Sequence, residues 1–151
     1  MMLQFLAGTL ISVINIGLHA LVTVVAVVIA RNAGWRVTSR PRLNLMGVMI
    51  ATAVVLMTAH MIEVLIWAVT YDLMDVVSDD KDLLYFAFVN YTTLGYGDIT
   101  PVLNWQLIGP LTAMNGVLLF GWSAAILFEV LRKTLERLGL TQTSDTNSPR
   151  I

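Results

Sequence analysis

Three long apolar segments limit what this chain can fold into. Residues 3–30 contain no charged side chain, and residues 43–71 and 104–132 are also mainly apolar. A membrane-spanning helix needs about 20 mainly apolar residues. The chain has 151 residues, of which 57% are hydrophobic and only 13% are charged, and its mean hydropathy is +0.77. The sequence therefore predicts an all-α membrane protein with three transmembrane helices.

Composition also argues against several classes of function. The net charge is −1, which gives no reason to expect a nucleic-acid partner, and the absence of cysteine rules out disulfides and thiolate metal sites. No nucleophile–base pair and no metal cluster is visible in the sequence, and His60 with Glu63 lacks a third partner there. We therefore expect neither an enzyme nor a bound cofactor.

The first apolar segment is predicted to be a retained helix rather than a signal peptide. A signal peptide would have a basic start and a short apolar core. Here residues 1–4 contain no basic residue, and the apolar run is too long. His19 lies near the middle of this segment. It is expected either to hydrogen-bond to a neighbouring helix or to form a proton-sensitive site.

A short stretch between the second and third apolar segments has the composition of an ion-selectivity filter. Rings of backbone carbonyls can replace the water shell of K⁺. Successive carbonyls face one axis only if the backbone alternates in conformation, with some residues at positive φ, which glycine adopts at little cost. Gly95 and Gly97 have the necessary spacing. The full stretch is Thr92, Thr93, Leu94, Gly95, Tyr96, Gly97 and Asp98.

The other side chains of this stretch have expected roles as well. Thr93 can add a hydroxyl oxygen at the inner mouth, and Tyr96 can brace the loop against neighbouring helices. Asp98 can attract cations at the outer mouth.

Residues 82–101, DLLYFAFVNYTTLGYGDITP, resemble the pore helix and selectivity filter of small prokaryotic potassium channels with two transmembrane helices around a pore loop. The resemblance extends less specifically over residues 43–135 and does not cover residues 1–42, which would hold an extra helix and a basic loop. It implies an outer helix at 43–71, a pore helix at 82–93, a filter at 93–98 and an inner helix at 104–132. Residues 136–151 would be a short tail.

The resemblance also implies where the permeant ion binds. K⁺ would be held by Thr93, Leu94, Gly95 and Tyr96. Leu94 stands where many members have valine, but either residue contributes a backbone carbonyl, so we expect selectivity to survive. Asn90 stands where a small hydroxyl residue is common, which would alter the stability of the filter.

Two ionisable residues lie within the second apolar segment. His60 and Glu63 are three residues apart and would share a helix face. Ionisable groups inside a membrane usually face protein or water. Together with His19, they are expected to form either a polar clamp between helices or a pH-responsive element.

The third apolar segment contains three residues of interest. In the family, an inner-helix glycine is often a gating hinge, which makes Gly116 the candidate, with Gly121 close by. Close packing is the alternative for Gly116. Asn115 would either face the pore cavity, where four copies form a ring of amides, or make an interhelical hydrogen bond.

Several local features follow from position. Trp67 and Tyr71 suit the aromatic belt at the outer membrane interface. Asp82 is expected in the first turn of the pore helix, with a cap among residues 78–80. Pro110 would fall in the first third of the inner helix and could kink it.

The distribution of basic residues predicts the orientation in the membrane. Only Lys81 lies on the side of the filter, and basic loops stay on the cytoplasmic side. We therefore expect a multi-pass protein of the cytoplasmic membrane with the N-terminus and filter outside and the tail inside. The basic residues of the other side are Arg31, Arg36, Arg40, Arg42, Arg132, Lys133, Arg137 and Arg150.

One chain supplies one filter strand, whereas a K⁺ filter needs four, so the sequence predicts a homotetramer. Its partners would be K⁺, the lipid bilayer and its own copies. The expected function is passive, selective K⁺ conduction. The alternatives are a weakly selective cation channel and a non-conducting scaffold or sensor subunit. A transporter with four pore-loop repeats is disfavoured because the chain has one repeat. The first helix has no row of arginines, which gives no support for a voltage sensor of that type.

Overall fold

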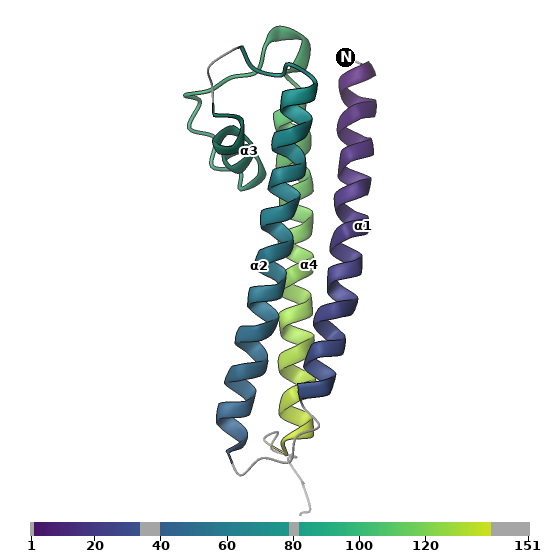
Figure 1. Ribbon diagram of the computed structural model, residues 1–151, viewed down its shortest axis with the longest axis vertical. Helices are drawn as coiled ribbons and strands as arrows, with labels where there is room; N and C mark the ends of the chain where they lie inside the picture. The colour runs from purple at the N-terminus through teal and green to yellow at the C-terminus, as the bar shows by residue number, and fades with distance from the viewer. Residues whose placement is uncertain (1, 34–39, 79–81, 140–151) are drawn as a thin grey trace, which may run out of the picture.

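The computed structural model describes residues 2–33, 40–78 and 82–139, and every regular element in these ranges is helical. The long helices are α1 (Met2–Ala33), α2 (Pro41–Leu73) and α4 (Ile108–Arg137), and the short ones are α3 (Leu83–Tyr91) and the 3₁₀ helix η1 (Leu103–Trp105). The three long helices lie side by side, and α3 lies beside the upper part of α2 and α4 (Figure 1). All three are long and apolar enough to cross a membrane. The prediction of an all-α chain with three such helices is confirmed.

The outward faces of the long helices carry apolar side chains. Leu10 and Val24 on α1, Met57 on α2 and Phe128 on α4 are all more than half exposed. Such faces are unfavourable in water and suit the hydrocarbon interior of a bilayer. The polar side chains within the bundle, in contrast, point toward neighbouring helices.

The start of α3 differs from its prediction. Asp82 is not inside the first turn but is the N-cap residue, and its Oδ1 accepts a hydrogen bond from the Tyr85 amide at 2.9 Å. The side chain thereby satisfies one of the amide groups that have no partner within the helix. Of the residues proposed as caps, 79 and 80 lie outside the described residues.

The start of α4 also differs from its prediction. The α-helix begins at Ile108, after the separate 3₁₀ turn Leu103–Trp105, so Pro110 lies in its first turn. The amide groups of a first turn have no partner within the helix. Proline therefore removes no helical hydrogen bond here, and the expected cause of a kink is absent.

Trp67 and Tyr71 lie in the core, and their prediction as membrane-interface residues is wrong. Both are fully buried, and they pack in one cluster with Phe86 and Tyr91 of α3. The reason is that α3 folds back against α2 and covers the face that would otherwise meet the interface.

The segment between α2 and α4 leaves and returns at the same end of the bundle. It turns after α2, passes through α3 and runs back through the filter stretch to the start of α4 (Figure 1). A hydrogen bond from the Val102 amide to the Val76 carbonyl, with an N···O distance of 2.9 Å, joins the two ends of this segment. The filter stretch is therefore held on a closed loop whose two ends are joined.

Gly116 of α4 provides the first prediction because α4 packs there directly on α3. A Cβ atom at Gly116 would overlap the carbonyl oxygen of Tyr91, whereas a Cβ at Gly121 would meet nothing within 4 Å. We expect Gly116→Ala to destabilise the protein by about 1–3 kcal/mol through overpacking. Gly121→Ala should be neutral or slightly stabilising because alanine favours the helix.

Thermal unfolding of the two variants in the same detergent, followed by circular dichroism, makes this comparison. A Gly116→Ala protein as stable as Gly121→Ala would contradict the close approach of α4 to Tyr91.

Candidate functional site

The end of α3 sets the direction of the backbone in the filter stretch. The amide groups of residues 93–95 donate hydrogen bonds to the carbonyls of Val89 and Asn90, at N···O distances from 2.9 to 3.4 Å. In a planar trans peptide unit, the N–H and C=O bonds point in opposite directions. The carbonyls of residues 92–94 therefore point away from α3.

The backbone of the stretch alternates in conformation. Thr93, Gly95 and Gly97 have φ angles of 61°, 59° and 77°, whereas Leu94 and Tyr96 between them are not at positive φ. The predicted positive φ is thus present at both glycines. Thr93 was not expected to share it. A β-branched residue is rarely found in this region, where the cost is of order 1–3 kcal/mol.

Asp98 at the end of the stretch is tied back to α3. Its Oδ2 accepts a hydrogen bond from the Tyr85 hydroxyl at 2.8 Å, and its Oδ1 accepts one from the Ile99 amide at 3.1 Å. The hydrogen bond to Asp98 raises the pKa of Tyr85 above its usual value of 10. This bond was not predicted, because Tyr85 lies 13 residues before Asp98 and shares no local pattern with it.

The filter stretch is exposed in the single chain. All residues from 92 to 98 are exposed, and Tyr96 has 68% of its surface accessible. Tyr96 was expected to brace the loop against neighbouring helices. Within one chain it remains largely open, so that role depends on further copies.

Asn90 is held behind the stretch by α2 and α4. Its Nδ2 donates to the Tyr71 hydroxyl at 3.4 Å, and that hydroxyl also hydrogen-bonds with Thr112 Oγ1 at 2.6 Å. A Cβ at Gly109 would come within 3.2 Å of Asn90 Oδ1, so a glycine there leaves room for the amide. The asparagine therefore connects the end of α3 with both flanking helices.

Asn115 makes interhelical hydrogen bonds and does not face a cavity. Its Oδ1 accepts from Trp67 Nε1 at 3.1 Å and from Asn15 Nδ2 at 3.2 Å, and its Nδ2 donates to the Ser12 carbonyl at 3.4 Å. The side chain is 2% exposed. Of the two alternatives in the sequence analysis, the structure supports the interhelical bond, and the cavity-facing alternative is wrong.

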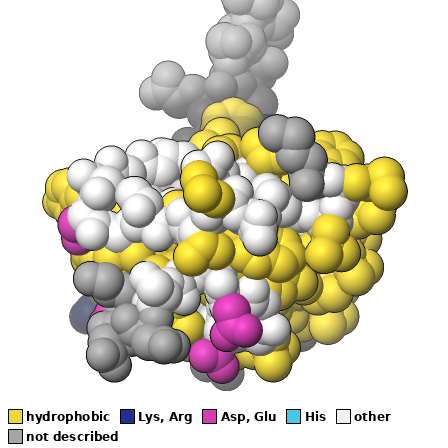
Figure 2. All heavy atoms as spheres, turned by 90° about the horizontal axis from the view of Figure 1, so that it is seen from above, with side chains coloured by type: hydrophobic (Ala, Val, Ile, Leu, Met, Phe, Trp, Pro, Cys, Tyr) yellow, Lys and Arg dark blue, Asp and Glu magenta, His cyan; other side chains and the backbone are white. Residues whose placement is uncertain are grey.

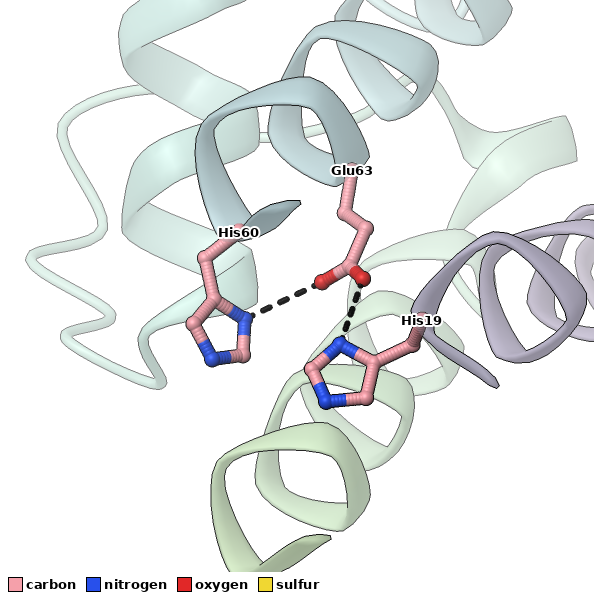
Figure 3. Close-up of side chains that lie close together, drawn as sticks. All are labelled: His19, His60 and Glu63. Carbon is pink, nitrogen blue, oxygen red and sulfur yellow. Dashed lines mark hydrogen bonds and ion pairs between the residues drawn. The ribbon is translucent and has the colours of Figure 1, made fainter. Parts of the chain in front are cut away.

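His19, His60 and Glu63 lie together inside the bundle (Figure 3). His19 Nδ1 is 2.8 Å from Glu63 Oε1, and His60 Nδ1 is 3.0 Å from Glu63 Oε2. The statement that His60 and Glu63 lack a third partner is therefore wrong. His19, which the sequence analysis grouped with this pair, reaches them from α1. Gating roles for Gly116 and Gly121, and pH sensitivity of this cluster, stay predictions.

A family model described as "ion channel" matches residues 59–133, which is just under half of the chain. The match begins in α2 and ends in α4, so it includes α3 and the filter stretch but not α1. No curated protein and no solved structure gave a significant match. The chain thus combines three helices that are long and apolar enough to cross a membrane with a segment similar to the ion channel family.

The bond between Tyr85 and Asp98 gives a prediction about titration. Because the carboxylate raises the pKa of Tyr85, this bond is present at and below pH 10 and is lost as the pH rises through the raised value. Replacing the charged acceptor in Asp98→Asn should lower the pKa of Tyr85. The absorbance of phenolate during a pH titration measures this change.

Tyr85→Phe identifies which transition belongs to Tyr85. Asp72→Asn, which changes an exposed carboxylate at the end of α2, should leave the titration unchanged. A Tyr85 transition at the same pH in Asp98→Asn and in the unchanged protein would contradict the hydrogen bond.

Proposed function

We propose that this protein is a subunit of a K⁺-selective channel that conducts K⁺ passively across the membrane. The observation that carries the proposal is the backbone of the filter stretch. Its alternating positive φ angles and its amide bonds to α3 turn successive carbonyls to the opposite side, where they accept no backbone hydrogen bond from the described residues. The carbonyl oxygens of Thr93, Leu94, Gly95 and Tyr96 would replace the water shell of the ion.

In this proposal α3 is a re-entrant pore helix. At nine residues it is about 14 Å long, which is too short to span a bilayer. Its C-terminal end meets the filter, and the negative end of the helix dipole favours a cation there. Irregular backbone at membrane depth is tolerated where it is buried in protein or lines water. The filter stretch would satisfy that condition in an assembled pore.

The orientation follows from charge at the two ends of the bundle. Asp98 lies at the end that holds α3, and acidic side chains are visible on this face (Figure 2). At the opposite end of the bundle, three basic residues lie at or next to the ends of the long helices: Arg31, Arg40 and Arg137. Basic residues favour the cytoplasmic side. The filter would then open outward, with the N-terminus on the same side, in the cytoplasmic membrane.

Reversal potentials of the purified full-length chain in planar bilayers, with K⁺ on one side and Na⁺ on the other, test selectivity. We expect reversal close to the K⁺ equilibrium potential. Gly95→Ala places a Cβ on a residue at positive φ and should abolish selective K⁺ current. Gly47→Ala is the matched control, because a Cβ there meets nothing within 4 Å.

The alternatives give different results in this experiment. Clear current that reverses near zero would indicate a weakly selective cation channel. Properly assembled protein that passes no current over a range of pH and voltage would indicate a non-conducting scaffold or sensor subunit. Either result would overturn the proposal of a selective channel.

The assembly has its own prediction. One chain would provide one strand of a K⁺ filter, and in the single chain every residue of that strand is exposed. We expect four copies around a fourfold axis, so native mass spectrometry in detergent should give four times the chain mass of 16.7 kDa. A monomer or dimer under conditions that preserve ion flux would contradict a filter built from four strands.

A further inference from the structure

The cluster of His19, His60 and Glu63 has the chemistry of a metal site. Its three side chains supply two imidazole nitrogens and a carboxylate oxygen, and the ligating atoms all lie within 4.8 Å of one another. His60 and Glu63 share one face of α2, and His19 reaches them from α1 (Figure 3). We propose that these residues bind a divalent transition-metal ion of the Zn²⁺ class, which joins α1 to the ion channel domain.

The distances fit such an ion after small rotations of the side chains. Ligand atoms bound to Zn²⁺ at about 2.0–2.1 Å in a tetrahedron lie about 3.4 Å apart. In the structure, each histidine Nδ1 already lies 2.8–3.0 Å from a different oxygen of Glu63. Each of these two nitrogen–oxygen separations would widen by roughly half an ångström if both atoms were bonded to one such ion.

The hydrogen bonds of Ser123 with the two histidines depend on the charge of the cluster that His19, His60 and Glu63 form. Ser123 Oγ lies 2.9 Å from His60 Nε2 and 3.2 Å from His19 Nε2. If both neutral rings donate from Nδ1 to Glu63, both Nε2 atoms are acceptors. A serine hydroxyl has one hydrogen and can satisfy only one of them. The other contact is satisfied only if the cluster holds one more positive charge, which is either a proton or a metal ion.

A metal ion on the two Nδ1 atoms completes this network. Each Nε2 then carries a hydrogen, and the two lone pairs of Ser123 Oγ accept both. Histidines that bind metals usually donate their other ring N–H to a protein acceptor in this way. Ser123 would act as a positioning residue that orients both rings.

The surroundings supply a further oxygen. Tyr91 donates a hydrogen bond to Glu63, and its hydroxyl lies 2.9 Å from His60 Nδ1. Nitrogen and oxygen donors without sulfur suit Zn²⁺ and neighbouring transition metals, whereas Ca²⁺ and Mg²⁺ prefer oxygen alone. Tyr91 is also the last residue of α3, so the site adjoins the element that holds the filter.

The location also favours a bound cation. The side chains of His19 and Glu63 are fully buried, and that of His60 is 8% exposed. An uncompensated carboxylate inside a membrane protein is costly, and a metal ion would compensate Glu63 directly. Because the site is closed, we expect the ion to enter slowly, when α1 separates from α2.

Metal content of the purified full-length protein tests the proposal. Protein stripped with a chelator and then dialysed for a long period against buffered Zn²⁺ should contain one zinc per chain by elemental mass spectrometry. His19→Gln and Glu63→Gln should each lower the affinity at least about tenfold. Glu129→Gln is the matched control, since this carboxylate pairs with Arg132 and Lys133 on a more exposed face of α4.

Ser123→Ala keeps the test valid if a ligand variant fails to fold. It retains every ligand and should weaken zinc binding about 10–100-fold through loss of the acceptor for both rings. The proposal would be overturned if the folded protein of unaltered sequence takes up no zinc. It would also be overturned if folded His19→Gln takes up as much zinc as that protein. The additional positive charge would then be a proton. This measurement does not involve current, so its failure would leave the proposed K⁺ conduction untouched.

Discussion

Peptide groups inside a bilayer have no water to bond with, so each N–H and C=O needs a partner within the protein. The filter stretch is not helical and cannot satisfy its own amides. It donates three of them to Val89 and Asn90, whose carbonyls lie at the end of α3 and have no partner within that helix. One set of hydrogen bonds thereby completes the end of the helix and turns the carbonyls of residues 92–94 away from it. Those oxygens then need partners of their own, and in the proposed channel a permeant cation would supply them.

The same constraint gives α1 its place in the bundle. Apolar contacts between helices give little preference in lipid, whereas hydrogen bonds between helices fix their register. Three polar side chains of α1 bond to the rest of the chain at different depths. Gln4 accepts from the Leu107 amide, Asn15 donates to Asn115, and His19 bonds to Glu63. The family match excludes α1, yet all three of these partners lie within the matched segment. The first helix is therefore hydrogen-bonded at several depths to the segment that matches the family model.

The sequence predicted the features that depend on neighbouring residues and missed those that depend on distant ones. Apolar length revealed the three long helices, and the two glycines revealed where positive φ occurs. His19 was grouped with Glu63 as ionisable groups inside apolar segments, but no local pattern shows the bond between them, which spans 44 residues. The bond from Asn15 to Asn115 spans 100 residues, so the sequence could not identify that partner either. Trp67 was placed at the membrane interface because composition cannot show that α3 covers it. Positive φ at Thr93 was missed because it comes from the hydrogen bonds around that residue and not from the side chain.

Tyr91 is the residue through which the buried cluster and the filter stretch are mechanically joined. Its hydroxyl reaches Glu63, its carbonyl fits against Gly116, and the strained Thr93 follows two residues later. A strained backbone persists only where the surrounding contacts determine it strongly. Tyr91 is fixed at both its side chain and its backbone, so it provides such a determined position just before the strain. Tyr91 is therefore a direct contact between Glu63 and the residues that precede the filter stretch.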